Sequence, residues 1–138
     1  MSSTFGKNLK ISLFGESHSK AIGVVLDGLP SGFTIDFNKI KDDLSKRAPG
    51  KDEISTKRRE PDTPHIICGL VNNTTTGTPL CAIIENKDQR PADYDKISNL
   101  LRPGHADYTS FIKYNGFNDK RGAGHSSGRL TAPLVFAG

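Results

Sequence analysis

Two of the four histidines lie where an imidazole could transfer protons. His18 and His105 each sit in a glycine-containing loop, within GESHSK and RPGHADY, beside carboxylates and basic side chains. A histidine flanked in this way can donate or accept a proton near neutral pH. For either loop alone a solvated or capping histidine is the commoner outcome, so the pattern by itself leaves both interpretations open.

The histidines and cysteines form no familiar metal motif. No two histidines have the i, i+4 spacing of a helical metal pair, and neither Cys68 nor Cys81 completes a zinc pattern with one of them. We therefore predict no metal site. His65 opens an apolar segment directly after a proline and is expected at the surface.

A glycine-rich basic segment, KRGAGHSSGRLTAP at 120–133, could hold an anion. Gly122 and Gly124 allow the backbone to approach a ligand closely, and Ser126 and Ser127 add two hydroxyls before an expected helix. The segment matches neither GxxxxGK[ST] nor GxGxxG. It indicates an anion site only weakly, and a flexible basic linker is the alternative.

Basic residues also gather in the loop 46–59. Arginine suits phosphate and carboxylate because its planar fork binds two oxygens at once. Acidic side chains lie among and just after the basic ones, which argues against a plain nucleic-acid stripe and leaves a solvated loop as the common outcome. The basic members are Lys46, Arg47, Lys51, Lys57, Arg58 and Arg59, and the acidic ones are Asp52, Glu53, Glu60 and Asp62.

Composition limits the class of protein. The chain has 138 residues, of which 34% are hydrophobic, and a formal net charge of +4, so we expect one domain with a modest core and anionic partners. No apolar run reaches membrane-spanning length, and Met1–Lys10 lacks the apolar segment of a signal peptide. Cys68 and Cys81 lie in separate apolar runs and are expected to be buried, reduced thiols in a cytoplasmic protein.

Strands and helices are expected to alternate along the chain. Apolar and β-branched runs predict strands at 9–14, 22–26, 65–71 and 80–85. Spacing and caps predict a helix within 36–47, started by Asp36, and further helices at 94–101 and 107–114. A last helix is expected from Ser126, unless it starts later or bends, because Pro133 would otherwise lie in its interior. Residues 51–64 have no periodicity and read as a mobile loop.

Together these motifs resemble the chorismate synthases, in the order found in that family and over nearly the whole chain. The motifs are GESH at 15–18, KRxPG at 46–50, KRREPD at 57–62, TTGTP at 75–79, DQR at 88–90, DY at 93–94, RPGHADYT at 102–109 and RGxGxSS at 121–127. The resemblance implies an α+β fold, a β-α-β sandwich, of which residues 1–138 would be the N-terminal portion. Because family members are longer, we expect the chain to be truncated at its C-terminus and catalytically incomplete alone.

The resemblance also implies a reaction. Members of the family remove phosphate from 5-enolpyruvylshikimate 3-phosphate by a 1,4-anti elimination to give chorismate, the last step of the shikimate pathway towards aromatic amino acids. They require reduced FMN without net redox change, and NADPH is a possible reductant. A cytoplasmic homotetramer is implied for the full-length enzyme, with no nucleic-acid or membrane partner.

Roles for individual residues follow from the resemblance. His18 would act as the general acid for phosphate departure, and His105 would protonate or stabilise the reduced flavin. The residues that would contact FMN are His125, Ser126 and Ser127. The arginines that would bind the anionic substrate are Arg47, Arg58, Arg102, Arg121 and Arg129.

The sequence departs from the family pattern at a few positions. Ser19 stands where a glycine usually follows GESH, and Ala123 and His125 replace a glycine and an arginine of RGGGRSS. Ala48 and Glu53 stand where arginines are expected. Two alternatives to the enzyme remain at this point: a non-enzymatic anion- or nucleic-acid-binding module that uses the loop 46–59, and a flavin-binding redox protein of different chemistry.

Overall fold

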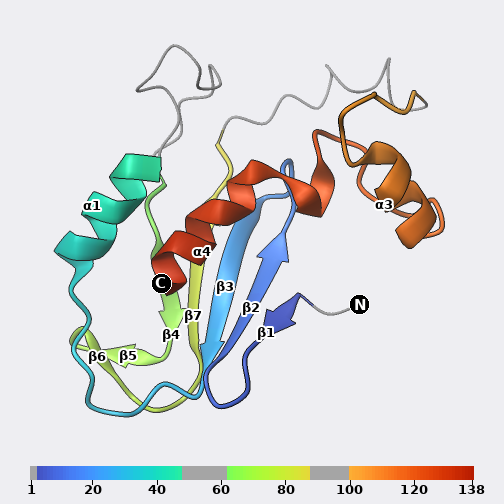
Figure 1. Ribbon diagram of the computed structural model, residues 1–138. Coiled ribbons are helices and arrows are strands. Elements are labelled where there is room, and N and C mark those ends of the chain that lie inside the picture. Colours follow the sequence, from blue (N-terminus) through green and yellow to red (C-terminus); the bar gives the residue numbers. More distant parts are fainter. Residues whose placement is uncertain (1–2, 48–61, 88–99) are drawn as a thin grey trace.

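The computed structural model describes residues 3–47, 62–87 and 100–138 (Figure 1). Its main element is a five-stranded antiparallel sheet in the order β1-β2-β3-β7-β4. The strands are β1 (Thr4–Phe5), β2 (Lys10–Gly15), β3 (Ala21–Asp27), β4 (His65–Cys68) and β7 (Leu80–Glu85). A separate two-stranded ribbon pairs β5 (Leu70–Val71) with β6 (Thr74–Thr75).

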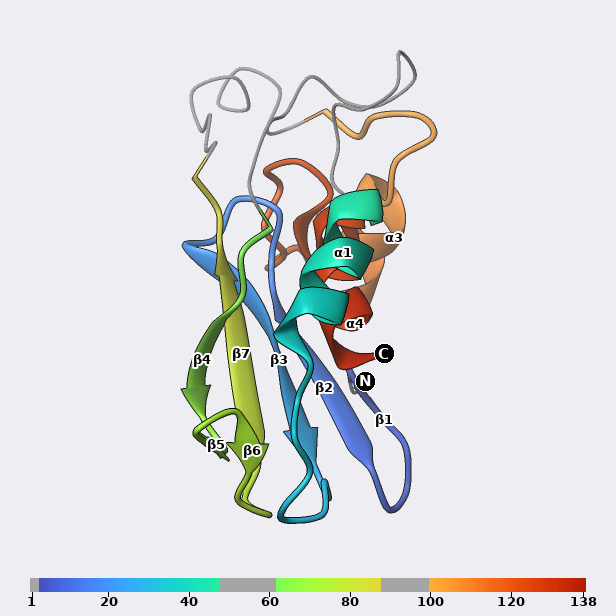
Figure 2. The same ribbon diagram turned by 90° about the vertical axis from the view of Figure 1, so that its left-hand side faces the viewer.

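Two helices cover one face of the sheet. Helices α1 (Phe37–Arg47) and α4 (Thr131–Ala137) lie together on that side (Figure 2). Because strand side chains alternate between faces, every second residue of β3 and β7 points towards them and is buried. The buried core consists of Ile22, Val24, Leu26, Leu80, Ala82 and Ile84 from the strands with Leu44, Leu130, Ala132 and Phe136 from the helical layer. The predicted α+β architecture is confirmed.

Helix α1 begins and ends as the sequence predicts. The Oδ1 atom of Asp36 accepts hydrogen bonds from the backbone N–H groups of Asn38 and Lys39 at 3.0 and 3.1 Å. Lys46 and Arg47 occupy the last turn, where cations interact favourably with the helix dipole. Because α1 ends at Arg47, the side chain of Arg47 lies at one end of the sheet (Figure 1).

The prediction of a C-terminal helix starting at Ser126 is wrong, and its alternative of a later start is confirmed. Short 3-10 turns occupy Gly124–Ser126 (η1) and Gly128–Leu130 (η2), and α4 starts only at Thr131. Ser127 between the two turns is extended, with φ −68° and ψ 144°, and its side chain accepts a hydrogen bond from the Arg129 N–H. Pro133 then lies in the first turn of α4, where a missing N–H costs no helical hydrogen bond.

The prediction of one strand over 65–71 is also wrong, because Gly69 interrupts it. Gly69 has φ +93°, and a Cβ there would lie 2.5 Å from the Cα of Leu80. The chain then turns through Asn72 and Asn73, which both have positive φ, as a two-residue hairpin requires. The predicted pairing of the 65–71 and 80–85 segments holds for β4 and β7, whose register shifts between Ile66 and Cys68.

The expectation of two buried thiols is wrong. Cys68 is exposed and Cys81 is half-buried, because both residues lie on the face of the sheet opposite α1 and α4. Cys81 alternates with the buried residues Leu80 and Ala82 on β7. His65, predicted at the surface, is exposed.

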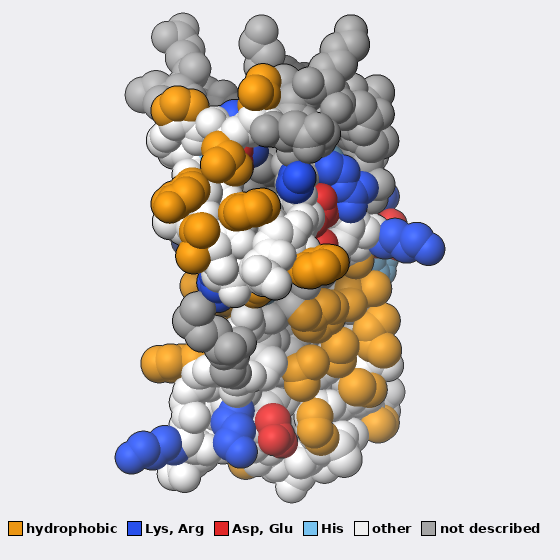
Figure 3. Space-filling model, turned by 90° about the vertical axis from the view of Figure 1, so that its right-hand side faces the viewer, with side chains coloured by type: hydrophobic (Ala, Val, Ile, Leu, Met, Phe, Trp, Pro, Cys, Tyr) orange, Lys and Arg blue, Asp and Glu red, His pale blue; other side chains and the backbone are white. Residues whose placement is uncertain are grey.

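Helix α3 (Asp107–Lys113) confirms the helix predicted at 107–114 and buries none of its residues. Figure 3 shows apolar side chains gathered on this side of the molecule. Those exposed on α3 and the turn after it are Tyr108, Phe111, Ile112, Tyr114 and Phe117. Most of the helix predicted at 94–101 and of the loop predicted at 51–64 lies outside the described residues.

Candidate functional site

Segments far apart in sequence meet at one end of the sheet. The loop joining β2 to β3, the C-terminal end of α1, the end of β7 and the turns η1 and η2 all lie at the same end in Figure 1. The backbone N–H of Ser17 donates to the carbonyl oxygen of Gly124 at 2.9 Å. The side-chain amide of Asn86 donates to the carbonyl oxygens of Glu16 and Ser19 at 3.1 and 2.9 Å.

Ser19 closes the loop that contains GESH. Its hydroxyl oxygen accepts a hydrogen bond from the Glu16 N–H at 2.9 Å. The same oxygen lies 2.9 Å from the carbonyl oxygen of Glu16 and 2.7 Å from that of Ala21, so its proton has two acceptors within reach. Ser19, which departs from the family pattern, therefore fits this turn because its hydroxyl forms hydrogen bonds with backbone groups of the loop.

His18 is buried against the glycine-rich segment, with 6% of its surface exposed. Gly122 has φ +60°, and a Cβ at that position would lie 2.8 Å from Ser17 Oγ and 3.2 Å from His18 Cδ2. A side chain at position 122 would therefore displace the loop that carries His18. This contact brings the GESH and RGxGxSS segments together.

Two carboxyl groups lie beside these loops. Burial would raise the pKa of Asp119, but hydrogen bonds from Arg121, together with the charges of Arg121 and His18, hold that pKa below its usual value. Burial raises the pKa of Glu16, and so does the neighbouring Asp119. The pair therefore divides into a carboxylate at Asp119 and a carboxyl group at Glu16 that holds its proton more tightly.

Arg102 joins RPGHADY to the glycine-rich segment. Its Nε and Nη2 atoms donate to the two carboxylate oxygens of Asp107 at 2.8 and 2.9 Å, and Nη2 also donates to the carbonyl oxygen of Gly122. The side-chain hydrogen bond from Arg102 is the main cause that lowers the pKa of Asp107 to about 2. His105 lies in the same loop and is exposed.

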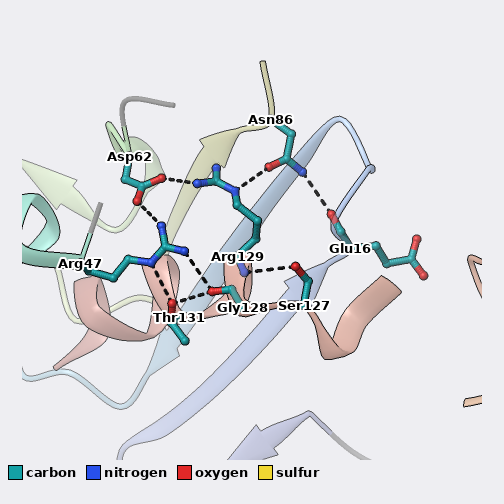
Figure 4. Close-up of polar contacts among 8 residues, drawn as sticks. All are labelled: Glu16, Arg47, Asp62, Asn86, Ser127, Gly128, Arg129 and Thr131. Atoms are coloured by element: carbon teal, nitrogen blue, oxygen red, sulfur yellow. Dashed lines mark hydrogen bonds and ion pairs between the residues drawn. The ribbon is translucent and has the colours of Figure 1, made fainter. Parts of the chain in front are cut away.

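A buried carboxylate, Asp62, holds two arginines (Figure 4). Nη1 of Arg47 donates to one oxygen of Asp62, and Nη1 of Arg129 donates to the other. The Asp62 side chain is 1% exposed, so its charge is compensated by these partners rather than by water. In the sequence Asp62 stood out only as the last residue of KRREPD and as one of the acidic residues near the basic loop 46–59.

The arginines are tied further into the fold. Arg47 donates from Nε to Thr131 Oγ1 at 2.8 Å and from Nη2 to the carbonyl oxygen of Gly128 at 3.0 Å. Arg129 donates from Nε to Asn86 Oδ1 at 3.2 Å. Asn86 therefore links the arginine cluster to the GESH loop, a role that no sequence motif indicated.

His125 and Ser126 line a cavity of about 530 Å³ beside β2 and α3. Nδ1 of His125 lies 2.8 Å from the carbonyl oxygen of Gly15, and Nε2 lies 2.9 Å from Ser3 Oγ. Because a carbonyl oxygen only accepts, Nδ1 carries the proton, and in the neutral ring Nε2 accepts from Ser3. The cavity is also lined by the aromatic residues Phe14, Tyr114 and Phe117 and by the acidic residues Glu16 and Asp119.

Comparison with known proteins decides the family. Residues 9–138 match the family model described as chorismate synthase. The chain belongs to the chorismate synthase family. It is 52% identical over 135 residues to the chorismate synthase of Albidiferax ferrireducens, covering 98% of this chain and 37% of that relative. It is 50% identical over 133 residues to that of Thermococcus kodakarensis, covering 96% and 37%.

The similarity to chorismate synthases extends to the fold. A crystal structure of chorismate synthase matches 94% of this chain and 31% of its own with a TM-score of 0.63 and 24% identity, which supports the fold alone. The chain spans less than two-fifths of the length of the curated chorismate synthases that it matches. Neither alternative from the sequence analysis, a non-enzymatic binding module or a flavin-binding redox protein of different chemistry, describes this family.

Most residues carried over from the chorismate synthases lie at this end of the sheet. The residues whose contacts hold them there are His18, Arg47, Arg102 and Arg129. Arg121 lies beside Glu16 and Asp119. Ser127 holds the turn before α4, and Arg58 lies outside the described residues. Among the residues that the structure describes, no group of three or more potential metal ligands occurs, and no helix is long and apolar enough to cross a membrane.

Proposed function

We propose that this chain forms the N-terminal part of a chorismate synthase active site, which eliminates phosphate from 5-enolpyruvylshikimate 3-phosphate to give chorismate. One observation carries the proposal: the GESH, RPGHADY and RGxGxSS segments meet through the Ser17–Gly124 and Arg102–Gly122 hydrogen bonds. The remaining groups of the site are proposed to come from the part of such enzymes that this chain does not span.

His18 is proposed as the general acid. A departing phosphate leaves more readily when a proton reaches its bridging oxygen, and an imidazolium can supply one. The charge of His18 contributes to lowering the pKa of Asp119, so a carboxylate lies close enough to interact with the proposed acid. Burial of His18 keeps water from competing for the proton.

Arginines are proposed to bind the substrate's phosphate and two carboxylates. Arg47 and Arg129 are held on Asp62, which fixes the direction of both guanidinium groups at the end of α1 and before α4. Arg102 and Arg121 each make paired hydrogen bonds to a carboxylate and are proposed as weaker contributors to the positive potential, as is Arg58.

The residues at the 530 Å³ cavity fit part of a flavin. Its volume lies within the range of small-molecule sites, and the rings of Phe14, Tyr114 and Phe117 suit a planar heterocycle. The carboxyl groups in the same lining disfavour a phosphate there. We therefore propose that His125 and Ser126 contact the ring system, and that Ser127 lies close by.

Reduced FMN, when bound, would supply electron density to the substrate without net oxidation or reduction. His105 is proposed to hold or deliver a proton near that ring, and its exposed position in RPGHADY leaves the imidazole accessible. The family resemblance further supports NADPH as the reductant of the flavin, a homotetramer for the full-length enzyme, and a cytoplasmic location.

A chimera tests the proposal. The segment of the Albidiferax ferrireducens chorismate synthase that matches this chain is replaced by residues 1–138, and phosphate release from the substrate is measured with reduced FMN under anaerobic conditions. We expect turnover, and we expect His18→Ala in the chimera to lower kcat by about 10²–10⁴-fold, the usual contribution of a general acid. The unaltered relative and its own His→Ala variant at the equivalent position serve as controls.

Two results would contradict the proposal. One is a chimera that folds and binds FMN but releases no phosphate. The other is a chimera whose turnover is unaffected by His18→Ala, which would remove the assigned role while leaving family membership intact.

A further inference from the structure

Cys68 and Cys81 face each other across neighbouring antiparallel strands. They are register partners in the β4–β7 pair, which lies at one edge of the sheet (Figure 2). The pair comes directly after the register shift between Ile66 and Cys68. Directly opposed residues in a regular antiparallel pair have Cα atoms roughly 4.5–5.5 Å apart, with side chains on the same face. Disulfides span Cα separations of about 4.4–6.8 Å, so the strand register meets the first geometric requirement.

The two thiols differ in accessibility. Both cysteines are free. Cys68 is exposed, and Cys81 is half-buried on the face of the sheet opposite to its buried neighbours Leu80 and Ala82. Burial raises the pKa of the Cys81 thiol, and the nearby Cys68 raises it further. The charge interaction between the two cysteines agrees with their close approach. The exposed thiol is therefore the one that a dissolved oxidant meets first, because thiol reactivity depends on access and on the thiolate fraction.

We propose that Cys68 and Cys81 form a covalent modification site, at which a small-molecule disulfide such as oxidised glutathione converts the pair to a cross-strand disulfide. The Cys68 thiolate attacks one glutathione sulfur and expels the other as glutathione thiolate. The Cys81 thiolate then attacks the Cys68 sulfur and expels the second glutathione. Two protein thiols are oxidised, one glutathione disulfide is reduced, and the two thiol protons end on the released glutathione.

The cross-link has a structural consequence. It would close the segment 69–80, which contains β5 and β6, and fix the edge strand β4 to β7. Closing a loop lowers the conformational entropy of the unfolded chain, so the oxidised protein should unfold at a higher temperature than the reduced one. The inference goes beyond the proposed elimination and does not depend on it.

Exchange with glutathione tests the site directly. The native chain is incubated with excess oxidised glutathione, quenched with acid, and examined by thiol titration and intact mass. We expect loss of both thiols, a mass lower by two hydrogens, and a peptide map that links Cys68 to Cys81. A product that retains glutathione on either cysteine, a dimer linked between chains, or two unreacted thiols would overturn the proposal.

Single variants separate the two roles. Cys81→Ser should stop the reaction at a stable mixed disulfide on Cys68, because no second thiol is present to expel glutathione. Cys68→Ser should leave Cys81 reacting more slowly than the Cys68 of the other variant. The same exchange in concentrated urea is the matched control, and mixed disulfides should predominate there because the strands no longer hold the thiols together. Equal yields of the internal disulfide in urea and in buffer would show that the fold does not create the site.

Discussion

The buried side chain of Asp62 accepts a hydrogen bond from the guanidinium of Arg129, which lies 67 positions later in the chain. Its other carboxylate oxygen accepts from Arg47. One carboxylate thus connects the end of α1, the entry to β4 and the turn before α4. This arrangement makes Asp62 both a stability element and a positioning group for two proposed substrate ligands.

Replacing Asp62 should be costly. Asp62→Ala leaves two guanidinium groups without their buried carboxylate, and removal of one partner from a buried ion pair typically costs about 3–5 kcal/mol. Asp62→Asn retains an acceptor oxygen and should lose less. Urea unfolding of the chain measures both changes. Asp43→Asn is the control, because the Lys46–Asp43 pair is solvent-exposed and should leave the unfolding midpoint unchanged. Equal effects at positions 62 and 43 would contradict the role of Asp62.

Gly122→Ala should destabilise the chain for two separable reasons. The new methyl group would meet Ser17 and His18, and alanine at φ +60° is strained in the left-handed region. Gly104→Ala has the second cause only, since φ is +76° with no atom within 4 Å, and should cost about 1–2 kcal/mol. Gly128→Ala has neither cause and should change stability by no more than about 0.5 kcal/mol. Urea unfolding should therefore rank the losses as position 122, then 104, then 128.

Acid should weaken the Arg102–Asp107 pair. The pKa of Asp107 is lowered from 3.8 to about 2 in the folded chain, chiefly by the hydrogen bond from Arg102. A carboxyl group with a depressed folded-state pKa adds stability above its unfolded pKa, and this contribution is lost as the pH falls from about 4 to about 2. Asp107→Asn should remove this part of the pH dependence. Denaturant midpoints measured between those pH values check the result, and parallel curves for both proteins would exclude the pair as its source.

Glu16 should have the opposite sign. Burial, and next the charge of Asp119, raise its pKa above 4.5, so the folded state favours the protonated form. Stability is then highest below the unfolded pKa and falls as the pH rises through the raised folded value. Glu16→Gln should flatten this fall and stabilise the chain at neutral pH. Thermal melts across that window provide the measurement, and a variant less stable than the parent at neutral pH would contradict the sign.

The sequence predicted those features of the fold that depend on local chemistry. Asp36 fixes the start of α1 by accepting hydrogen bonds from nearby backbone N–H groups. The apolar runs of β3 and β7 predict strands, and alternate residues of both strands lie in the core. The sequence left the start of α4 open between Ser126 and a later residue, because local pattern does not reveal that Ser127 is extended between two 3-10 turns. The break at Gly69 depends on close contact with Leu80, which no local pattern reveals.

The candidate site was predicted unevenly for the same reason. Histidines and arginines within recognisable motifs could be named, because their chemistry is visible in their residue types. Asp62 and Asn86 act by joining distant segments, and the sequence does not show that they meet. Cys68 and Cys81 were wrongly predicted to be buried, because an apolar run does not reveal which of its residues face the helices.

The Arg47–Asp62 hydrogen bond also joins the two ends of the segment 48–61. The entropy cost of bringing two residues together grows only with the logarithm of the number of residues between them, by about 0.6 kcal/mol for each doubling. A change in the number of residues between Arg47 and Asp62 should therefore alter the free energy of unfolding less than a substitution of either residue.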